Sequence, residues 1–104
     1  MKKKILIVNA NYYKEISNGL LSSALKLIEG QYSIKLIDVP GVFEIPVTIS
    51  KNLKKFDAFI ALGCVIKGQT PHFDFISQAS TTAIMTLSIE SRKPIGNGII
   101  TCLN

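Results

Sequence analysis

The chain has 104 residues, of which 47% are hydrophobic, and a formal net charge of +5. This length predicts a single domain, residues 1–104, and the apolar fraction excludes a disordered chain. No segment approaches the roughly 20 apolar residues of a membrane span. The apolar run after the first lysines has four residues, too few for the core of a signal peptide, so we expect a cytoplasmic protein.

The basic residues and the two cysteines exclude further classes of function. Three lysines stand together at residues 2–4, the others are scattered along the sequence, and no basic stripe is interleaved with aromatics. We therefore expect no nucleic-acid partner. Cys64 and Cys102 both lie in apolar contexts, which predicts reduced core residues. Two isolated cysteines and one histidine make no zinc pattern, so no metal site is expected.

Strand-like and helix-like segments alternate along the chain. A short β-rich run at residues 4–9 is followed by apolar residues at helical spacing from Ile16 to Ile28, and Gly30 ends that helix. The next strand-like segment, residues 33–39, stops at the turn pair Pro40-Gly41. The first half of the chain thus predicts a strand, a helix and a second strand.

The second half continues the same alternation. Apolar residues at helical spacing from Ile45 to Leu53 predict a second helix, with a proline in its first turn. Residues 57–66 are nearly all apolar, as in a parallel strand buried on both faces. A third helix is predicted from Ile76 to Leu87, and a fourth strand over residues 95–101.

The order β-α-β-α-β-α-β predicts an α/β three-layer sandwich. We expect a four-stranded parallel sheet with right-handed crossovers and the flavodoxin-like strand order 2-1-3-4. Three helices cover two faces unevenly, so we also expect exposed apolar surface on one face. Ligands of such sheets bind beyond the carboxyl ends of the strands. Residues 9–13, 40–44 and 67–73, and those after Thr101, fall at that edge.

The only histidine of the chain falls in one of these segments. Thr70 and Pro71 suit the start of a helix, so the loop from Lys67 to Thr70 would present free N–H groups to a phosphate. His72 would lie in the first turn, where the helix dipole favours a neutral imidazole that can accept a proton. The alternative is a plain strand-to-helix turn with a solvated lysine and a surface histidine.

Two further segments at this edge are ambiguous. Phe43 and Glu44 suit a site for a flat heterocycle, or a core aromatic and a carboxylate favoured by a helix N-terminus. Tyr12 and Tyr13 suit a stacking platform, or a rim that packs against the first helix. A nucleotide-binding module is a separate alternative, because residues 63–70 are one residue short of a phosphate loop. Gln69 stands where that loop needs a lysine, which disfavours it.

Three sequence stretches resemble one enzyme family. "GVFEIP" (Gly41–Pro46) and "GCVIKGQTPHFDFI" (Gly63–Ile76) resemble the signature stretches of 6,7-dimethyl-8-ribityllumazine synthases, of riboflavin biosynthesis. "GNGIIT" (Gly96–Thr101) is similar to the fourth-strand motif of that family in its alphaproteobacteria-like members. The resemblance runs almost without gaps from Lys4 to Asn104.

The resemblance implies a transferase. Members condense 5-amino-6-(D-ribitylamino)uracil with 3,4-dihydroxy-2-butanone 4-phosphate, release phosphate and water, and use no metal or organic cofactor. The implied partners are these two small-molecule substrates and further copies of the chain in a homo-pentamer, which in some members builds a 60-subunit capsid. Riboflavin synthase is a further implied partner, and neither nucleic acid nor a membrane is.

The resemblance also implies a role for each matching residue. His72 would transfer protons, and Lys67, Gln69 and Thr70 would bind the phosphate. The residues implied to hold the pyrimidine and its ribityl chain are Tyr12, Val42, Phe43, Glu44, Val65, Ile66 and, from the neighbouring subunit's side, Asn97.

The sequence departs from the family pattern at several positions. Asn11 replaces an arginine before the stacking aromatic, Lys67 replaces a second arginine, and Gln69 replaces an acidic residue. The family also continues beyond the position of Asn104 with helices that carry a phosphate-binding arginine. The domain is therefore expected to be incomplete at its C-terminus, as a fragment or as a degenerate member. A non-catalytic assembly or ligand-binding member of the family is the alternative function.

Overall fold

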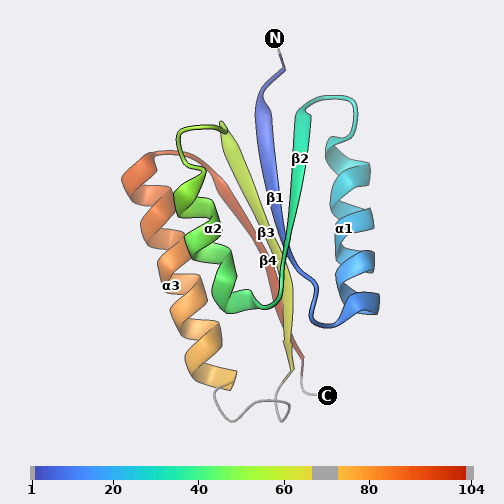
Figure 1. Ribbon diagram of the computed structural model, residues 1–104, viewed down its shortest axis with the longest axis vertical. Helices are drawn as coiled ribbons and strands as arrows, with labels where there is room; N and C mark the ends of the chain where they lie inside the picture. The colour runs from blue at the N-terminus through green and yellow to red at the C-terminus, as the bar shows by residue number, and fades with distance from the viewer. Residues whose placement is uncertain (1, 67–72, 103–104) are drawn as a thin grey trace.

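A computed structural model describes residues 2–66 and 73–102 of the chain (Figure 1). Its elements are β1 (Lys4–Ala10), α1 (Lys14–Ile28), β2 (Ser33–Val39), the 3-10 helix η1 (Val42–Glu44), α2 (Ile45–Lys51), β3 (Ala58–Ile66), α3 (Phe73–Ser91) and β4 (Ile95–Cys102). The four strands are parallel and lie in the order β2-β1-β3-β4. The predicted fold class and strand order are therefore confirmed.

The structure differs from the sequence prediction most clearly around the second helix. The second helix was expected to reach Leu53, but α2 ends at Lys51. The side chain of Asn52 donates from Nδ2 to the carbonyl oxygen of Thr48 at 2.7 Å, which satisfies a terminal carbonyl of the helix. Leu53 nevertheless packs against the core from the turn that follows. The other difference is η1, a 3-10 turn between Gly41 and α2 that the sequence pattern did not predict.

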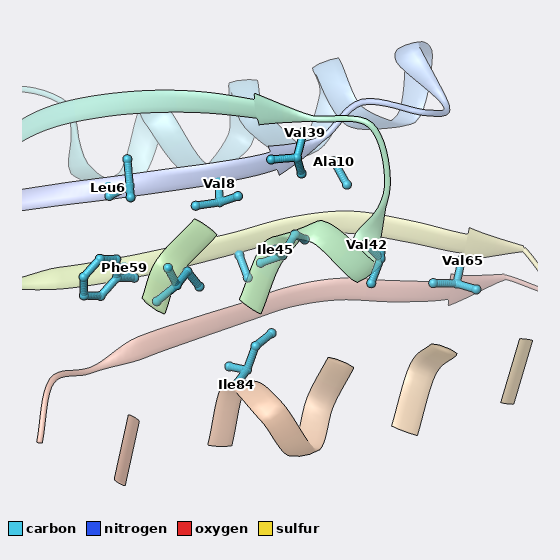
Figure 2. Close-up of a cluster of buried hydrophobic side chains, with 11 residues drawn as sticks. Leu6, Val8, Ala10, Val39, Val42, Ile45, Phe59, Val65 and Ile84 are labelled. Atoms are coloured by element: carbon cyan, nitrogen blue, oxygen red, sulfur yellow. The ribbon is translucent and has the colours of Figure 1, made fainter. Parts of the chain in front are cut away.

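Helices cover the two faces of the sheet unequally. In Figure 1, α1 lies on one face, whereas α2 and α3 lie together on the other. The larger core fills the space between the sheet and the α2–α3 pair (Figure 2). It contains the buried side chains of Leu6, Val8, Ala10, Val39, Val42, Ile45, Ile49, Phe59, Ala61, Val65 and Ile84. A smaller core under α1 is built on Ile5, Ile7 and Leu62.

The edge strand β4 is thinly covered on the α1 side. Ile95 and Ile99 pack into the larger core, so the strand alternation directs Gly96, Gly98 and Ile100 to the opposite face. Ile100 is exposed there. Among the described helices, only α1 lies on this face, which agrees with the expectation of unevenly covered apolar surface. No helix within the described ranges has the length and apolar character needed to cross a membrane.

Gly63 is expected to be intolerant of a side chain. A Cβ atom at this position would lie 2.8 Å from Val42 Cγ2 and 3.1 Å from Ala10 Cβ. Overpacking of this kind costs about 1–3 kcal/mol, so Gly63→Ala should lower the urea midpoint of unfolding. Gly19→Ala in α1 is the matched control, because nothing lies within 4 Å of its Cβ position. It should stabilise the helix by about 1 kcal/mol, and equal midpoints for the two variants would contradict the packing argument.

Candidate active site

A cavity of about 330 Å³ lies at the carboxyl edge of the sheet. The ends of β1 and β3, the segment that follows β2, and the first turns of α3 form its walls. Its lining residues are Tyr12, Tyr13, Gly41, Val42, Cys64, Val65, Ile66 and Ile76. Four residues that the sequence assigned to substrate binding thus meet in one cavity: Tyr12, Val42, Val65 and Ile66.

The inner wall of the cavity is apolar and buried. Val65 and Ile66 end β3, and Val42 begins η1; all three are at most 9% exposed. The missing Cβ at Gly63 allows Val42 to lie against β3, which brings η1 onto the end of the sheet. A flat apolar wall of this kind suits one face of a heterocyclic ring.

Two tyrosines form the outer rim. Tyr12 is 73% exposed, and its ring meets that of Tyr13 edge to face at a centroid distance of 4.8 Å. Partial burial raises the pKa of Tyr13 above its usual value near 10, with smaller contributions from the neighbouring Tyr12 and Cys64. The Tyr13 phenol therefore stays protonated at physiological pH and can donate a hydrogen bond at the rim.

Phe43 and Glu44 flank this cavity from η1 without lining it. Phe43 is half exposed, and its ring meets that of Phe75 on α3 edge to face at 5.9 Å. The Glu44 carboxylate reaches back over Gly41, where a Cβ would lie 3.2 Å from Oε1. The Glu44 amide donates to the Gly41 carbonyl at 3.1 Å, which closes the 3-10 turn. This turn leaves Phe43 at the surface, so the alternative of a core aromatic is wrong.

A buried polar network supports the tyrosine segment from behind. Asn9 is 2% exposed, and its Nδ2 donates to Ser17 Oγ on α1 and to Asp38 Oδ1 on β2, each at 3.1 Å. The Asn11 amide extends the pairing by donating to the Val39 carbonyl at 3.0 Å. These bonds fix the end of β1 just before the two tyrosines. Sequence analysis missed this role, although an asparagine that ends an apolar strand is a usable signal.

The structure does not bring Asn97 into the same cavity. Asn97 pairs with Ala61, four residues before Val65, which places it about 13 Å back from the strand end. It is exposed on the edge strand, and its Oδ1 accepts a hydrogen bond from the Ile99 amide at 2.9 Å. Within one subunit, Asn97 therefore stands apart from Tyr12 and Val65.

The remaining predicted site residues lie outside the described residues. These are Lys67, Gln69, Thr70 and His72. The described chain resumes with α3 at Phe73, and Ile76 on this helix reaches the cavity. The parts of the chain that the structure describes hold no group of three or more metal-ligating side chains suited to a metal ion.

Four lining residues were not assigned to substrate binding: Gly41, Cys64, Ile76 and Tyr13, which the sequence left ambiguous together with Tyr12. Each lies next in sequence to a predicted site residue, or one helical turn away from one. Cys64 and Ile76 were assigned to a strand and a helix, and only the end of β3 and the start of α3 direct them to the cavity. Position at the carboxyl edge would have been the signal.

Comparisons with known proteins agree with this geometry. Residues 2–104 match the family model described as 6,7-dimethyl-8-ribityllumazine synthase. A protein of that name from Bartonella tribocorum is 42% identical over all of this chain and 73% of its own length. One from Methylobacterium radiotolerans is 44% identical over 94% of this chain and 62% of its own length. One from Renibacterium salmoninarum is 37% identical over 97% of this chain and 65% of its own length. The chain thus spans roughly two thirds of the length of these relatives.

Proposed function

Because the chain belongs to the 6,7-dimethyl-8-ribityllumazine synthase family, we propose that it forms 6,7-dimethyl-8-ribityllumazine. The substrates are 5-amino-6-(D-ribitylamino)uracil and 3,4-dihydroxy-2-butanone 4-phosphate, and phosphate and water are released. The observation that carries this proposal is the cavity at the carboxyl edge, where Tyr12, Val42, Val65 and Ile66 meet. We further propose a cytoplasmic location and a single domain.

The described residues suit the pyrimidine substrate. Its ring would lie against Val65 and Ile66, with the exposed ring of Tyr12 free to stack on the other face. The ribityl chain would run along η1, past Val42, Phe43 and Glu44, where a carboxylate can accept hydrogen bonds from hydroxyl groups. A site of this kind accelerates a condensation largely by holding the amine close to the incoming ketone.

The polar chemistry falls to the segment after β3. We assign proton transfer to His72, because amine addition, loss of water and ring closure each move a proton, and an imidazole titrates near neutrality. Phosphate binding is assigned to Gln69 and Thr70, with Lys67 as the cation. Lysine supplies a point charge there in place of the bidentate fork of an arginine.

A direct assay tests the proposal. The purified protein is mixed with both substrates, and the fluorescence of the lumazine product is followed together with phosphate release. Equal rates of product and phosphate formation, above the uncatalysed reaction, are the expected result. Binding of the pyrimidine without turnover would instead support a non-catalytic family member.

We also propose that subunits assemble through the outer face of α2 and α3, as a homo-pentamer. A shallow apolar groove of about 380 Å³ runs between these helices and includes Val47, Ala83 and Leu87. Large apolar side chains are exposed on the same pair of helices: Val47, Phe75, Met85 and Ile89. Apolar surface of this extent suits a subunit interface.

Asn97, exposed on an edge strand, is then available to the cavity of a neighbouring subunit. A 60-subunit capsid and docking of riboflavin synthase are further possibilities within this proposal.

Val47→Glu should disrupt this assembly. A carboxylate buried in an apolar interface costs about 3 kcal/mol, so the dissociation constant of the assembly should rise at least about 100-fold. Sedimentation equilibrium measures it. The matched control is Leu27→Glu, because Leu27 is 79% exposed on α1, away from the α2–α3 face. An unchanged mass for Val47→Glu, or an equal loss of mass for both variants, would contradict the proposed interface.

A further inference from the structure

Basic residues gather at the amino edge of the sheet, opposite the candidate active site. Two adjoining cavities there, of about 340 and 680 Å³, share Lys4, Lys54 and Lys55. Seven of the twelve basic residues line them, but only one of the seven acidic residues, Asp57, does so. The lysines, called the amino-edge cluster below, are Lys2, Lys3, Lys4, Lys35, Lys54, Lys55 and Lys93.

The parallel topology creates this cluster. In a parallel sheet, the segments that lead into the strands all meet at one edge. Lys2 and Lys3 precede β1, Lys54 and Lys55 precede β3, and Lys93 precedes β4. The same edge lies at the top of Figure 1, where the chain enters β1. Lysines that are scattered along the sequence therefore come together in three dimensions.

Backbone hydrogen bonds hold the cluster in place. The Lys3 carbonyl accepts from the Ser33 amide at 2.9 Å, and the Lys4 carbonyl accepts from the Asp57 amide at 2.8 Å. The Lys4 amide donates to Asp57 Oδ2 at 2.8 Å, which engages one oxygen of the one carboxylate nearby. Lys93 Nζ donates to the carbonyl oxygens of Leu53 and Phe56. These bonds join the connection that leads into β4 to the one that leads into β3. The lysine backbones are thus fixed, whereas the other ammonium groups stay exposed.

Positive charge is concentrated at the amino edge of the sheet. The excess of positive charge at the amino edge exceeds the net charge of +5 of the whole sequence. Like charges held this close repel one another, and an anion with several charges relieves the repulsion. We propose that the amino-edge cluster binds an oligophosphate, that is, an anion with two or more linked phosphate groups.

The chemistry of the cluster favours this ligand over other anions. Lysines act as point charges on flexible stems, which suits the spread charge of linked phosphates better than a single planar carboxylate. Single-stranded nucleic acid needs aromatic platforms for its bases. Phe56 is the one aromatic residue that lines either cavity, and it is partly buried against the larger core. Volumes of about 340 and 680 Å³ are in the usual range for small-molecule sites.

The amino-edge site is independent of the proposed synthase site. β3 runs from one edge to the other, and its nine residues separate the two sites by about 25 Å. A phosphate bound beside Thr70 would therefore leave the cluster empty, and an anion in the cluster would not reach the pyrimidine cavity. The proposal neither requires nor weakens the proposed enzymatic activity.

Isothermal titration calorimetry with sodium tripolyphosphate tests the proposal. Tripolyphosphate should bind more tightly than orthophosphate, and its affinity should fall as salt screens the charges. Lys54→Gln/Lys55→Gln should weaken binding about fivefold to tenfold, given the usual strength of exposed charge pairs. Lys2→Gln/Lys3→Gln should have a similar effect. Lys14→Gln/Lys26→Gln is the matched control; it removes the same charge from α1, outside both cavities, and should bind as the parent does.

Three results would overturn the proposal. Unchanged binding by both cluster variants would place the anion elsewhere, for example at the loop with Thr70. An equal loss of tripolyphosphate affinity in the α1 control would show that binding depends only on the overall charge of the protein. Cluster-dependent binding of a single-stranded oligonucleotide, without binding of tripolyphosphate or ATP, would assign the surface to nucleic acid instead. Binding of ATP and tripolyphosphate with equal affinity would support recognition of the phosphate chain alone.

Discussion

His72→Ala is expected to lower kcat for lumazine formation by roughly 10²-fold to 10⁴-fold, the usual contribution of a general acid–base residue. The KM for the pyrimidine should change little, because the proposed binding surface consists of Tyr12, Val65 and Ile66 in separate segments. The lower end of the range is the firmer expectation, since holding the two substrates together supplies much of the acceleration. Steady-state kinetics with product fluorescence gives both constants.

The matched control for His72→Ala is Gln78→Ala. Gln78 is exposed on α3 and does not line the cavity, so its removal tests whether any change in this helix slows the reaction. It should leave kcat within about twofold, as expected for a surface position. A kcat for His72→Ala equal to that of Gln78→Ala would remove the histidine from the mechanism. A fall in substrate affinity alone would reassign it to binding.

The largest effect on stability is expected at Phe59. This residue lies near the start of β3, at one end of the larger core (Figure 2), and is 1% exposed. The centroid of its ring lies 6.1 Å from that of Phe56. Truncation of a buried phenylalanine to alanine leaves a cavity and costs about 3–5 kcal/mol. Domains of this size have a free energy of unfolding of about 5–15 kcal/mol. The Phe59→Ala variant should therefore unfold at a much lower urea concentration, or fail to accumulate as folded protein on expression.

Two further variants make the Phe59 result interpretable. Phe59→Leu keeps most of the volume and should cost less than about 1.5 kcal/mol, which remains measurable if the alanine variant does not fold. Leu27→Ala removes an exposed side chain from α1, so its free energy of unfolding should stay within about 0.5 kcal/mol of that of the parent protein. All are compared at one protein concentration, because assembly adds concentration-dependent stability. Equal effects of Phe59→Leu and Leu27→Ala would show that this core tolerates loss of volume.

The two edges of the sheet have different chemistry for one topological reason. In a parallel sheet all strands point the same way, so the connections that leave the strands meet at one edge and those that enter them meet at the other. The leaving connections bring Tyr12 and Val42 to the apolar cavity. The entering connections bring Lys3, Lys54 and Lys93 together. One fold thereby holds an apolar cavity and a cationic surface about 25 Å apart, the length of a strand.

The sequence by itself determined the order of the elements, the parallel sheet and the family. The strands predicted at residues 4–9 and 57–66 are confirmed. Such predictions succeed because strand and helix periodicity depend on residues that are neighbours in the chain. The stretch Gly63–Ile76 identified the family for a similar reason, because its motif consists of consecutive residues. Strand order followed from general rules on crossovers, which depend on connection length and handedness.

Only the tertiary structure decided the contacts between segments far apart in the chain. Asn9 bridges Ser17 and Asp38, and Gly63 admits Val42, because β1, β2 and β3 are neighbours in the sheet. The same register keeps Asn97 away from the strand end. Local patterns contain no information on which distant side chain fills a given space, so only the pairing of the strands decided the walls of the cavity and the gathering of the lysines.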